Sequence, residues 1–291
     1  MATWLNTLRQ RRGWSVALLL SPATIIVVFF LILPLFIVVR YSFAGRDPYG
    51  AVLPTFTLQH YIALLRPLYV PIVLRSFQMA AANTALCLLV AYPVAYFIAF
   101  RARRFASLLV LLMIIPFWTN FLIRMSAWIM LLNRNGLINS VLQSLCLIDE
   151  PLKLLNTYGA VMVGLVYGFL PSAVLPIYAA LDSLDRSLLE AAQDLGASPL
   201  RTHLRVTIPL SLPGVIAATL FVFVPTLGVF VVPALLGGGK NILIGNLIVM
   251  LYLEFRNIPF GSAVAVVLLI IVLFGIALYM RVIRRVEGMQ S

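Results

Sequence analysis

Long apolar runs constrain the fold of this chain more than any other feature of its sequence. A helix rises about 1.5 Å per residue, so about 20 apolar residues cross a hydrocarbon core about 30 Å thick. Irregular backbone is too costly in lipid, and barrel strands would show a ten-residue alternation instead. The sequence therefore predicts an all-α integral membrane protein. Its transmembrane helices, about six, are expected near residues 14–39, 74–100, 105–132, 158–181, 210–236 and 262–280.

The composition supports a membrane location and argues against nucleic acid as a partner. Of 291 residues, 63% are apolar and 10% are charged, whereas soluble domains carry about 25% charged residues. The formal net charge is +12. Basic clusters beside membrane helices ordinarily set the topology and contact anionic lipid, so we expect membrane lipid and no nucleic acid as a partner.

Lys and Arg residues indicate the orientation of the chain. Clusters of three lie directly at span ends on one side, whereas the charges on the other side are scattered in longer loops. Because cytoplasmic loops carry the excess of Lys and Arg, this side is predicted to be cytoplasmic, with both termini on it. The clusters are Arg9, Arg11 and Arg12; Arg101, Arg103 and Arg104; Arg186, Arg201 and Arg205; and Arg281, Arg284 and Arg285.

A polar segment, 182–209, interrupts the apolar pattern before the fifth predicted span. Apolar residues recur at helical spacing from Leu188, which predicts a short amphipathic helix. Ser187 or Asp185 can cap its start, and Gly196 can end it in a left-handed conformation.

A second short helix can follow at once. Ser198 is a favourable N-cap and Pro199 suits the first helical position. Pro209 is expected to break this helix. An apolar ridge flanked by charge suits insertion into a groove of a soluble partner. A pair of helices resting on the membrane surface has the same pattern, and both interpretations remain open from the residues alone.

The same segment carries a longer pattern, Glu190-Ala191-Ala192 followed by Gly196, Val206, Pro209, Pro213 and Gly214. It resembles the EAA motif of permease subunits in bacterial ABC importers that depend on a binding protein. The resemblance implies a type I ABC importer permease fold, one permease domain over 1–291, and cytoplasmic coupling helices seated in a cleft of the ATPase subunit. The residues implied in ATPase coupling are Glu190, Ala191, Ala192, Asp194, Gly196, Ala197, Leu200, His203 and Pro209. Leu200 and His203 stand where many members have an aromatic residue.

Two further segments narrow the resemblance. The stretch 116-PFWTNFLIRMSAWIMLLNRNGLIN-139 looks like the third-span region of the first permease subunit of spermidine/putrescine-type systems. The stretches 236-LGGGKNILIGNLI-248 and 257-NIPFGSA-263 are similar to the outer loop and last-span entry of the same group. The resemblance implies import of a polyamine such as putrescine or spermidine; related chains move other small solutes, including opines and phosphonates.

The resemblance also implies the partners of the chain. They are a second permease subunit in a heterodimer, two ATPase subunits that hold ATP and Mg, and a periplasmic solute-binding protein, all at the bacterial inner membrane. The sequence alone leaves a homodimer open. No cofactor is expected on this chain, because it has no G-x-x-x-x-G-K-[ST] phosphate loop.

Other function classes fit the sequence less well. Ion-coupled carriers usually place acidic residues inside spans, and here all nine acids fall in loops or at span ends. Neither G-x-S-x-G nor H-E-x-x-H occurs, so no catalytic residue is assigned. His60 and His203 should lie on opposite sides of the membrane, which excludes a metal site built on both.

Four residues are candidates for the substrate path, namely Trp118, Asn120, Arg124 and Tyr167. Aromatic faces suit an ammonium-bearing solute through cation–π attraction, although Trp and Tyr near span ends also form interfacial belts, the interpretation favoured for Trp128. Arg124 is a strong charge near a span end, where snorkelling or pairing with a neighbouring helix is the alternative to a role in transport.

Overall fold

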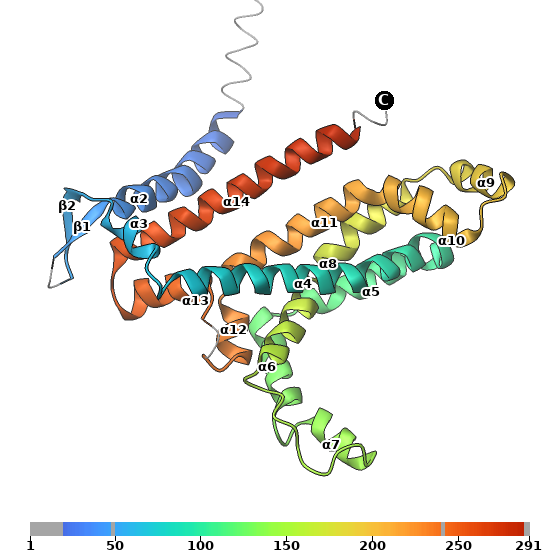
Figure 1. Ribbon diagram of the computed structural model, residues 1–291, viewed down its shortest axis with the longest axis horizontal. Coiled ribbons are helices and arrows are strands. Elements are labelled where there is room, and N and C mark those ends of the chain that lie inside the picture. The colour runs from blue at the N-terminus through green and yellow to red at the C-terminus, as the bar shows by residue number, and fades with distance from the viewer. Residues whose placement is uncertain (1–19, 48–49, 240–241, 288–291) are drawn as a thin grey trace, which may run out of the picture. The chain divides into compact units, whose positions relative to one another are not determined.

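The computed structural model describes residues 20–47, 50–239 and 242–287, with side chains in the last helix only as far as Arg281. Among these residues, five helices are long and apolar enough to cross a membrane, and a bent pair of helices provides a sixth candidate. The predicted all-α membrane fold is thereby confirmed (Figure 1). The chain forms two compact units, one comprising the described residues up to Leu64 with Leu251–Val267, the other Leu65–Met250 with the described residues from Leu268.

The first unit contains an apolar helix over residues 20–42 and a small hairpin that the sequence analysis did not predict. No residue of this helix's apolar window is buried. The two strands of the hairpin pair antiparallel. The Phe43 and Phe56 rings stack at 5.1 Å, which fixes the hairpin to the end of the helix, and the Tyr61 hydroxyl of the following short helix donates to Ser42 Oγ at 2.7 Å. The elements are η1 (Val28–Ile32), α2 (Leu33–Ser42), β1 (Ala44–Arg46), β2 (Val52–Phe56), α3 (Gln59–Leu64) and the start of α14 (Ile258–Glu287).

In the second unit, three long helices, α4, α8 and α11, pack side by side (Figure 1). Its elements are α4 (Val70–Tyr96), η2 (Phe97–Arg101), η3 (Arg103–Phe105), α5 (Ala106–Ile114), η4 (Ile115–Trp118), α6 (Phe121–Leu132), α7 (Leu137–Ser144), α8 (Tyr158–Asp182), α9 (Arg186–Asp194), α10 (Pro199–Thr202), η5 (His203–Thr207), α11 (Ile208–Gly228), α12 (Val231–Leu236) and α13 (Ile244–Val249). A π-helical turn, η6 (Met250–Glu254), leads from this unit into the first.

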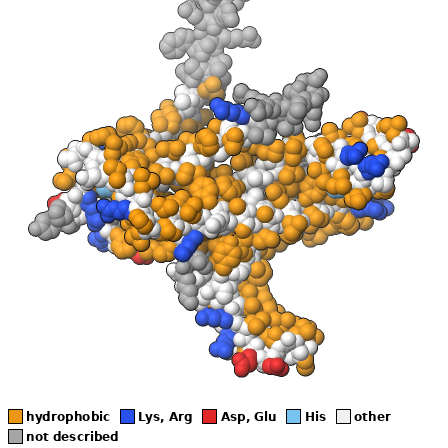
Figure 2. Space-filling view, in the orientation of Figure 1, with side chains coloured by type: hydrophobic (Ala, Val, Ile, Leu, Met, Phe, Trp, Pro, Cys, Tyr) orange, Lys and Arg blue, Asp and Glu red, His pale blue; other side chains and the backbone are white. Residues whose placement is uncertain are grey.

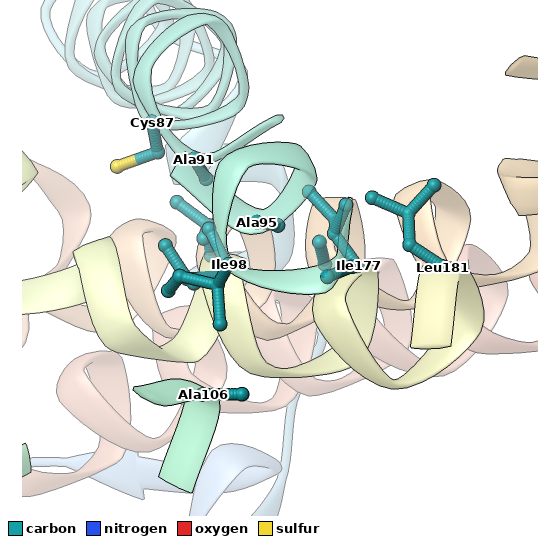
Figure 3. Packing of buried hydrophobic residues seen from close by; sticks show 12 residues of the cluster. Cys87, Ala91, Ala95, Ile98, Ala106, Ile177 and Leu181 are labelled. Atoms are coloured by element: carbon teal, nitrogen blue, oxygen red, sulfur yellow. The ribbon is translucent and has the colours of Figure 1, made fainter. Parts of the chain in front are cut away.

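Small residues let the three helices approach closely. Cys87, Ala91 and Ala95 of α4 share a buried cluster with Ile177 and Leu181 of α8, and Figure 3 shows Ala95 beside Ile177. In membranes, helix association depends on packing and interhelical hydrogen bonds, because lipid removes the hydrophobic driving force between helices. The small side chains on α4 therefore supply the close contact that holds the bundle.

One buried hydrogen bond joins α4 to α11. Asn83 Nδ2 donates to Thr226 Oγ1 at 2.9 Å, and the Thr226 hydroxyl donates in turn to the Val222 carbonyl at 2.6 Å. Both side chains are almost fully buried. The pair therefore fixes the relative height of the two helices as well as their contact.

Two predicted spans differ from the structure. A single helix was expected over 105–132, but the helices on either side of Thr119 and Asn120 are bent by 90°. Pro116 cannot donate to the preceding turn, and the Asn120 side chain accepts from Leu122 N and starts a new helix. The second difference concerns the span over 210–236, where the sequence also predicted a single helix.

In that second span, α11 ends at Gly228 and α12 starts at Val231. Val229 lies between them with φ −66° and ψ 133°, which is extended backbone. The chain therefore unwinds for a short turn inside the predicted span before a new helix begins.

We predict that Thr226→Val lowers stability, because it leaves Asn83 Nδ2 buried without an acceptor. The expected loss is about 1 kcal/mol, typical of interhelical hydrogen bonds in membranes. The midpoint of unfolding by SDS in mixed micelles measures it. Thr219→Val is the matched control, since the Thr219 hydroxyl donates only to Val215 O within its own helix. Equal midpoints for the two variants would refute the assigned role of the pair.

We also predict that Gly214→Ala forces α11 away from α8. A Cβ at Gly214 would lie 2.5 Å from Ala180 Cβ and 2.6 Å from the Pro176 carbonyl oxygen. Such overpacking costs about 1–3 kcal/mol. Gly168→Ala in α8 is the control, because its added methyl group meets no atom within 4 Å. The midpoint of unfolding by SDS is measured for both variants. A Gly214→Ala protein as stable as the control would contradict the close packing of α11 on α8.

Candidate functional site

The polar segment between α8 and α11 folds as a helix-turn-helix module, formed by α9, α10 and η5, at one end of the three-helix bundle (Figure 1). Asp185 caps α9 by accepting from Ser187 N at 2.9 Å. The hydrogen bonds from Ser187 lower the pKa of the exposed Asp185 carboxyl group. The cap is therefore ionised at neutral pH, where its negative charge also suits the helix N-terminus.

Gly196 ends α9 in the left-handed conformation that the sequence predicted, with φ +81°. Gly196 N donates to Gln193 O at 2.8 Å, and Ala197 N donates to Ala192 O at 3.0 Å. These two bonds make a Schellman motif, which satisfies the last carbonyl groups of the helix. The turn reverses the chain within four residues.

The second helix begins as predicted, but it does not end where the sequence indicated. Ser198 Oγ accepts from Arg201 N at 3.4 Å, and Pro199 occupies the first turn. Pro209 was expected to break this helix, whereas the helix continues from Pro199 to Gly228. The π-turn η5 widens the helix just before Pro209, so that this proline stands in the first turn of α11, where a missing N–H is tolerated. The module is thus continuous with a membrane span.

The outer side of the module is an apolar ridge of four leucines that touch little of the described chain. Their exposed fractions are 48% for Leu188, 89% for Leu195, 68% for Leu200 and 54% for Leu204. Charged side chains flank the ridge, and Figure 2 shows Lys and Arg gathered at this end of the bundle. Of the residues predicted for coupling, Glu190, Ala191, Asp194, Gly196, Leu200 and Pro209 are exposed, and Ala192, Ala197 and His203 are partly buried.

His203 lies on the inner side of the module. Its ring meets the Tyr96 ring edge-on at a centroid distance of 4.8 Å and the Tyr92 ring at 5.8 Å. Its Nδ1 atom is buried and has no hydrogen-bond partner in the described part of the chain. His203 therefore attaches the module to α4.

A second attachment was missed by the sequence analysis. Arg186 Nη2 donates to the Ala99 carbonyl at 3.3 Å, and its guanidinium group lies 5.9 Å from the centroid of the Phe100 ring. The His203 contact could not be predicted either. The four-residue spacing of Tyr92 and Tyr96 places them on one helix face, but nothing in the sequence indicates which residue packs on that face.

The four substrate-path candidates do not form one site. Arg124 and Tyr167 are joined through Phe117: the Arg124 guanidinium lies 4.6 Å from the Phe117 centroid, and the Phe117 and Tyr167 rings stack at 5.6 Å. Arg124 Nη1 also donates to Pro116 O at 3.0 Å, so this side chain braces the bend between α5 and α6. Asn120 uses its side-chain oxygen as a helix cap.

Two tryptophans nearby lie in different environments. Trp118 is 77% exposed. Trp128 packs edge-on against Tyr167 at 5.5 Å and lines a hollow of about 340 Å³ with Leu86, Val90, Met162, Val163, Val166 and Tyr167. The lining side chains are largely apolar, so this surface suits lipid or another hydrophobic chain better than a charged solute.

Within the described residues, no group of three or more His, Cys, Asp or Glu could hold a metal ion. Cys87 is buried and Cys146 is exposed, and neither forms a disulfide.

The chain is similar in sequence to a family of membrane transport proteins. Over residues 91–288 the chain matches the family described as "Binding-protein-dependent transport system inner membrane component". It is 43% identical to the spermidine/putrescine transport system permease protein PotB of Escherichia coli (strain K12), over 88% of this chain and 94% of the relative. The protein of the same name from Haemophilus influenzae is 40% identical, over 87% of this chain and 89% of the relative.

A solved structure supports the fold. A chain of a bacterial alginate ABC transporter in complex with an alginate pentasaccharide-bound periplasmic protein superimposes with a TM-score of 0.76, at 19% identity, over 94% of this chain and 96% of that chain. The likeness extends to almost every described element, which identifies the type I importer permease fold. The chain belongs to the inner membrane components of binding-protein-dependent transport systems, and it is a multi-pass permease subunit of an ABC importer, not an enzyme.

Proposed function

We propose that this permease imports a polyamine such as spermidine or putrescine by alternating access. The observation that carries the proposal is 43% identity, over 88% of the chain, to a permease named for spermidine and putrescine transport. The second relative, from another organism, carries the same name. We treat residues 1–291 as one permease domain.

The helix-turn-helix module serves as the handle that an ATPase subunit moves. Its leucine ridge is exposed and flanked by charge, and α9 is capped at both ends. Such a surface suits a groove on a soluble partner. The contacts we assign to the ATPase are Glu190, Ala191, Ala192, Asp194, Gly196, Ala197, Leu200 and Pro209. His203, packed on Tyr92 and Tyr96, passes the motion to α4.

We infer the remaining partners from membership in the importer family. A second permease subunit pairs with this chain in a heterodimer, and the helix over 20–42, whose apolar window has no buried residue, is free to contact lipid or that subunit. Two ATPase subunits hold ATP and Mg, and a periplasmic binding protein delivers the solute. The arginine clusters at span ends support cytoplasmic termini.

The substrate-path assignment is kept for Trp118, Asn120, Arg124 and Tyr167. Trp118 is the candidate whose ring is free to meet a solute, since 77% of it is exposed. Arg124 and Tyr167 shape the path by fixing the bend between α5 and α6.

A substitution at Gly196 tests the coupling role. Gly196→Val should reduce transport at least about tenfold, because a β-branched residue at φ +81° costs roughly 1–3 kcal/mol and opens the turn. Gly196→Asn should retain most transport, since Asn tolerates the left-handed region. Steric crowding would not explain a loss of transport by Gly196→Val, because a Cβ added at Gly196 meets no atom within 4 Å. Uptake and ATPase activity are measured together, and normal uptake by an inserted Gly196→Val complex would show that the module is a passive surface segment.

Reconstituted uptake tests the substrate class. Proteoliposomes that contain this chain with its co-purified subunits and binding protein should accumulate labelled putrescine or spermidine only when ATP and binding protein are both present. A neutral solute is the control. If ATPase activity responds to the loaded binding protein but no polyamine enters, the polyamine assignment is wrong and the importer assignment stands. Uptake that continues without ATP but stops when the ion gradient is dissipated would contradict the importer assignment and the mechanism that rests on it.

A further inference from the structure

The unwound turn between α11 and α12 lies deep in the bundle. The hydrogen bond from Asn83 to Thr226 sets its height. Asn83 is the middle residue of α4, 13 positions from Val70 (83 − 70) and 13 from Tyr96 (96 − 83). At 1.5 Å per residue, Thr226 lies about 20 Å from either end of α4. The turn begins two residues later, so it is at membrane depth.

The helices that follow are held against the bundle at this depth. Ile244 N, at the start of α13, donates to Ser76 Oγ of α4 at 2.8 Å. A Cβ at Gly164 of α8 would lie 2.9 Å from Val232 and 2.5 Å from Leu236, so α12 packs directly on the α8 backbone. The turn is therefore fixed in position by contacts to α4 and α8.

The turn presents two backbone carbonyl groups, those of Gly228 and Val229, to which no described backbone N–H donates. The Val229 carbonyl would accept from residue 233 in a continuous helix, and Pro233 has no N–H. A Cβ at Gly245 would lie 2.5 Å from the Gly228 oxygen and 2.8 Å from the Val229 oxygen, so only glycine there permits this carbonyl arrangement. Backbone carbonyl groups inside a protein normally have a donor, so two that lack one among the described residues are available acceptors.

A side chain adds a further acceptor. Asn246 Nδ2 donates at 2.9 Å to the Phe230 carbonyl, which also accepts from Ala234 N at 3.1 Å, and so supports the turn. Its Oδ1 atom is buried and has no partner in the described part of the chain. Acceptors that lack donors at this position favour a ligand that brings several N–H groups.

The outer side of the turn is open on this chain. Gly228 is exposed, and an added Cβ there would meet no atom within 4 Å. The Phe230 side chain is 43% exposed. Irregular backbone at membrane depth does not face lipid; it is buried in protein or lines a water-filled cavity. This face therefore lies toward the second permease subunit and the path between the subunits.

We propose that the turn Gly228–Phe230, with Asn246 behind it, is a station on the transport path that binds an alkylammonium group of the solute. An ammonium group has three N–H donors for the Gly228 and Val229 carbonyl oxygens, and the face of the Phe230 ring attracts its charge. The C-terminal end of α11 adds the negative end of its helix dipole. This assignment rests on the proposed polyamine function and names the residues that would recognise the amine.

Substitutions at Gly228 and Phe230 in the complete importer test the proposal. Gly228→Leu fills the open side of the turn and should lower polyamine uptake at least about tenfold, the loss of one charge-assisted hydrogen bond. ATPase stimulation by the loaded binding protein should persist. Gly275→Leu in α14 is the matched control, since it too has open space at the added Cβ, and its uptake should match wild type.

A second pair of variants keeps the test decisive if Gly228→Leu does not assemble. Phe230→Leu should lower uptake about threefold by removing the cation–π contribution, and Phe230→Tyr should restore it. Wild-type uptake by Gly228→Leu, or equal uptake by the two Phe230 variants, overturns this station while the polyamine function stands. A wild-type complex that takes up neither putrescine nor spermidine overturns both.

Discussion

The need to satisfy backbone hydrogen bonds in lipid governs this structure. Water cannot replace a missing partner inside the membrane, so the described spans are helices, and each departure from the α-helix has a local reason. The π-turns η1 and η5 end just before Pro34 and Pro209. Each places its proline in the first turn of a new α-helical segment, where a missing N–H does no harm. The chain thereby carries prolines within spans without losing continuity.

The same constraint distinguishes the break at Gly228–Phe230 from the other irregular segments. A π-turn keeps its hydrogen bonds, whereas an extended residue at Val229 gives them up. The Phe230 carbonyl keeps its helical donor, Ala234 N at 3.1 Å, and also accepts from Asn246 Nδ2, whereas no described backbone N–H donates to the Gly228 or Val229 carbonyl. Acceptors left at membrane depth need donors, and in the proposal made above a cationic solute supplies them.

Transport also requires that motion at the module reach the bundle. The capped turn makes the module rigid, and two contacts tie it to the end of α4: His203 on Tyr92 and Tyr96, and Arg186 on Ala99 and Phe100. The continuous helix from Pro199 to Gly228 links it to the proposed amine station at its far end. If the module is the ATPase handle and the turn the amine station that we propose, this helix connects the two directly.

The sequence by itself determined the membrane class, the approximate number of spans, and the helix-turn-helix module. Apolar length and the local chemistry of Asp185, Gly196, Ser198 and Pro199 act over a few residues, so they can be read directly from the sequence. Only the tertiary structure decided the bend at Thr119 and Asn120, the uninterrupted helix through Pro209, the inward side of His203, and the break at Gly228. Each depends on whether a backbone or side-chain group finds its partner on a distant element, and the sequence does not record which elements meet.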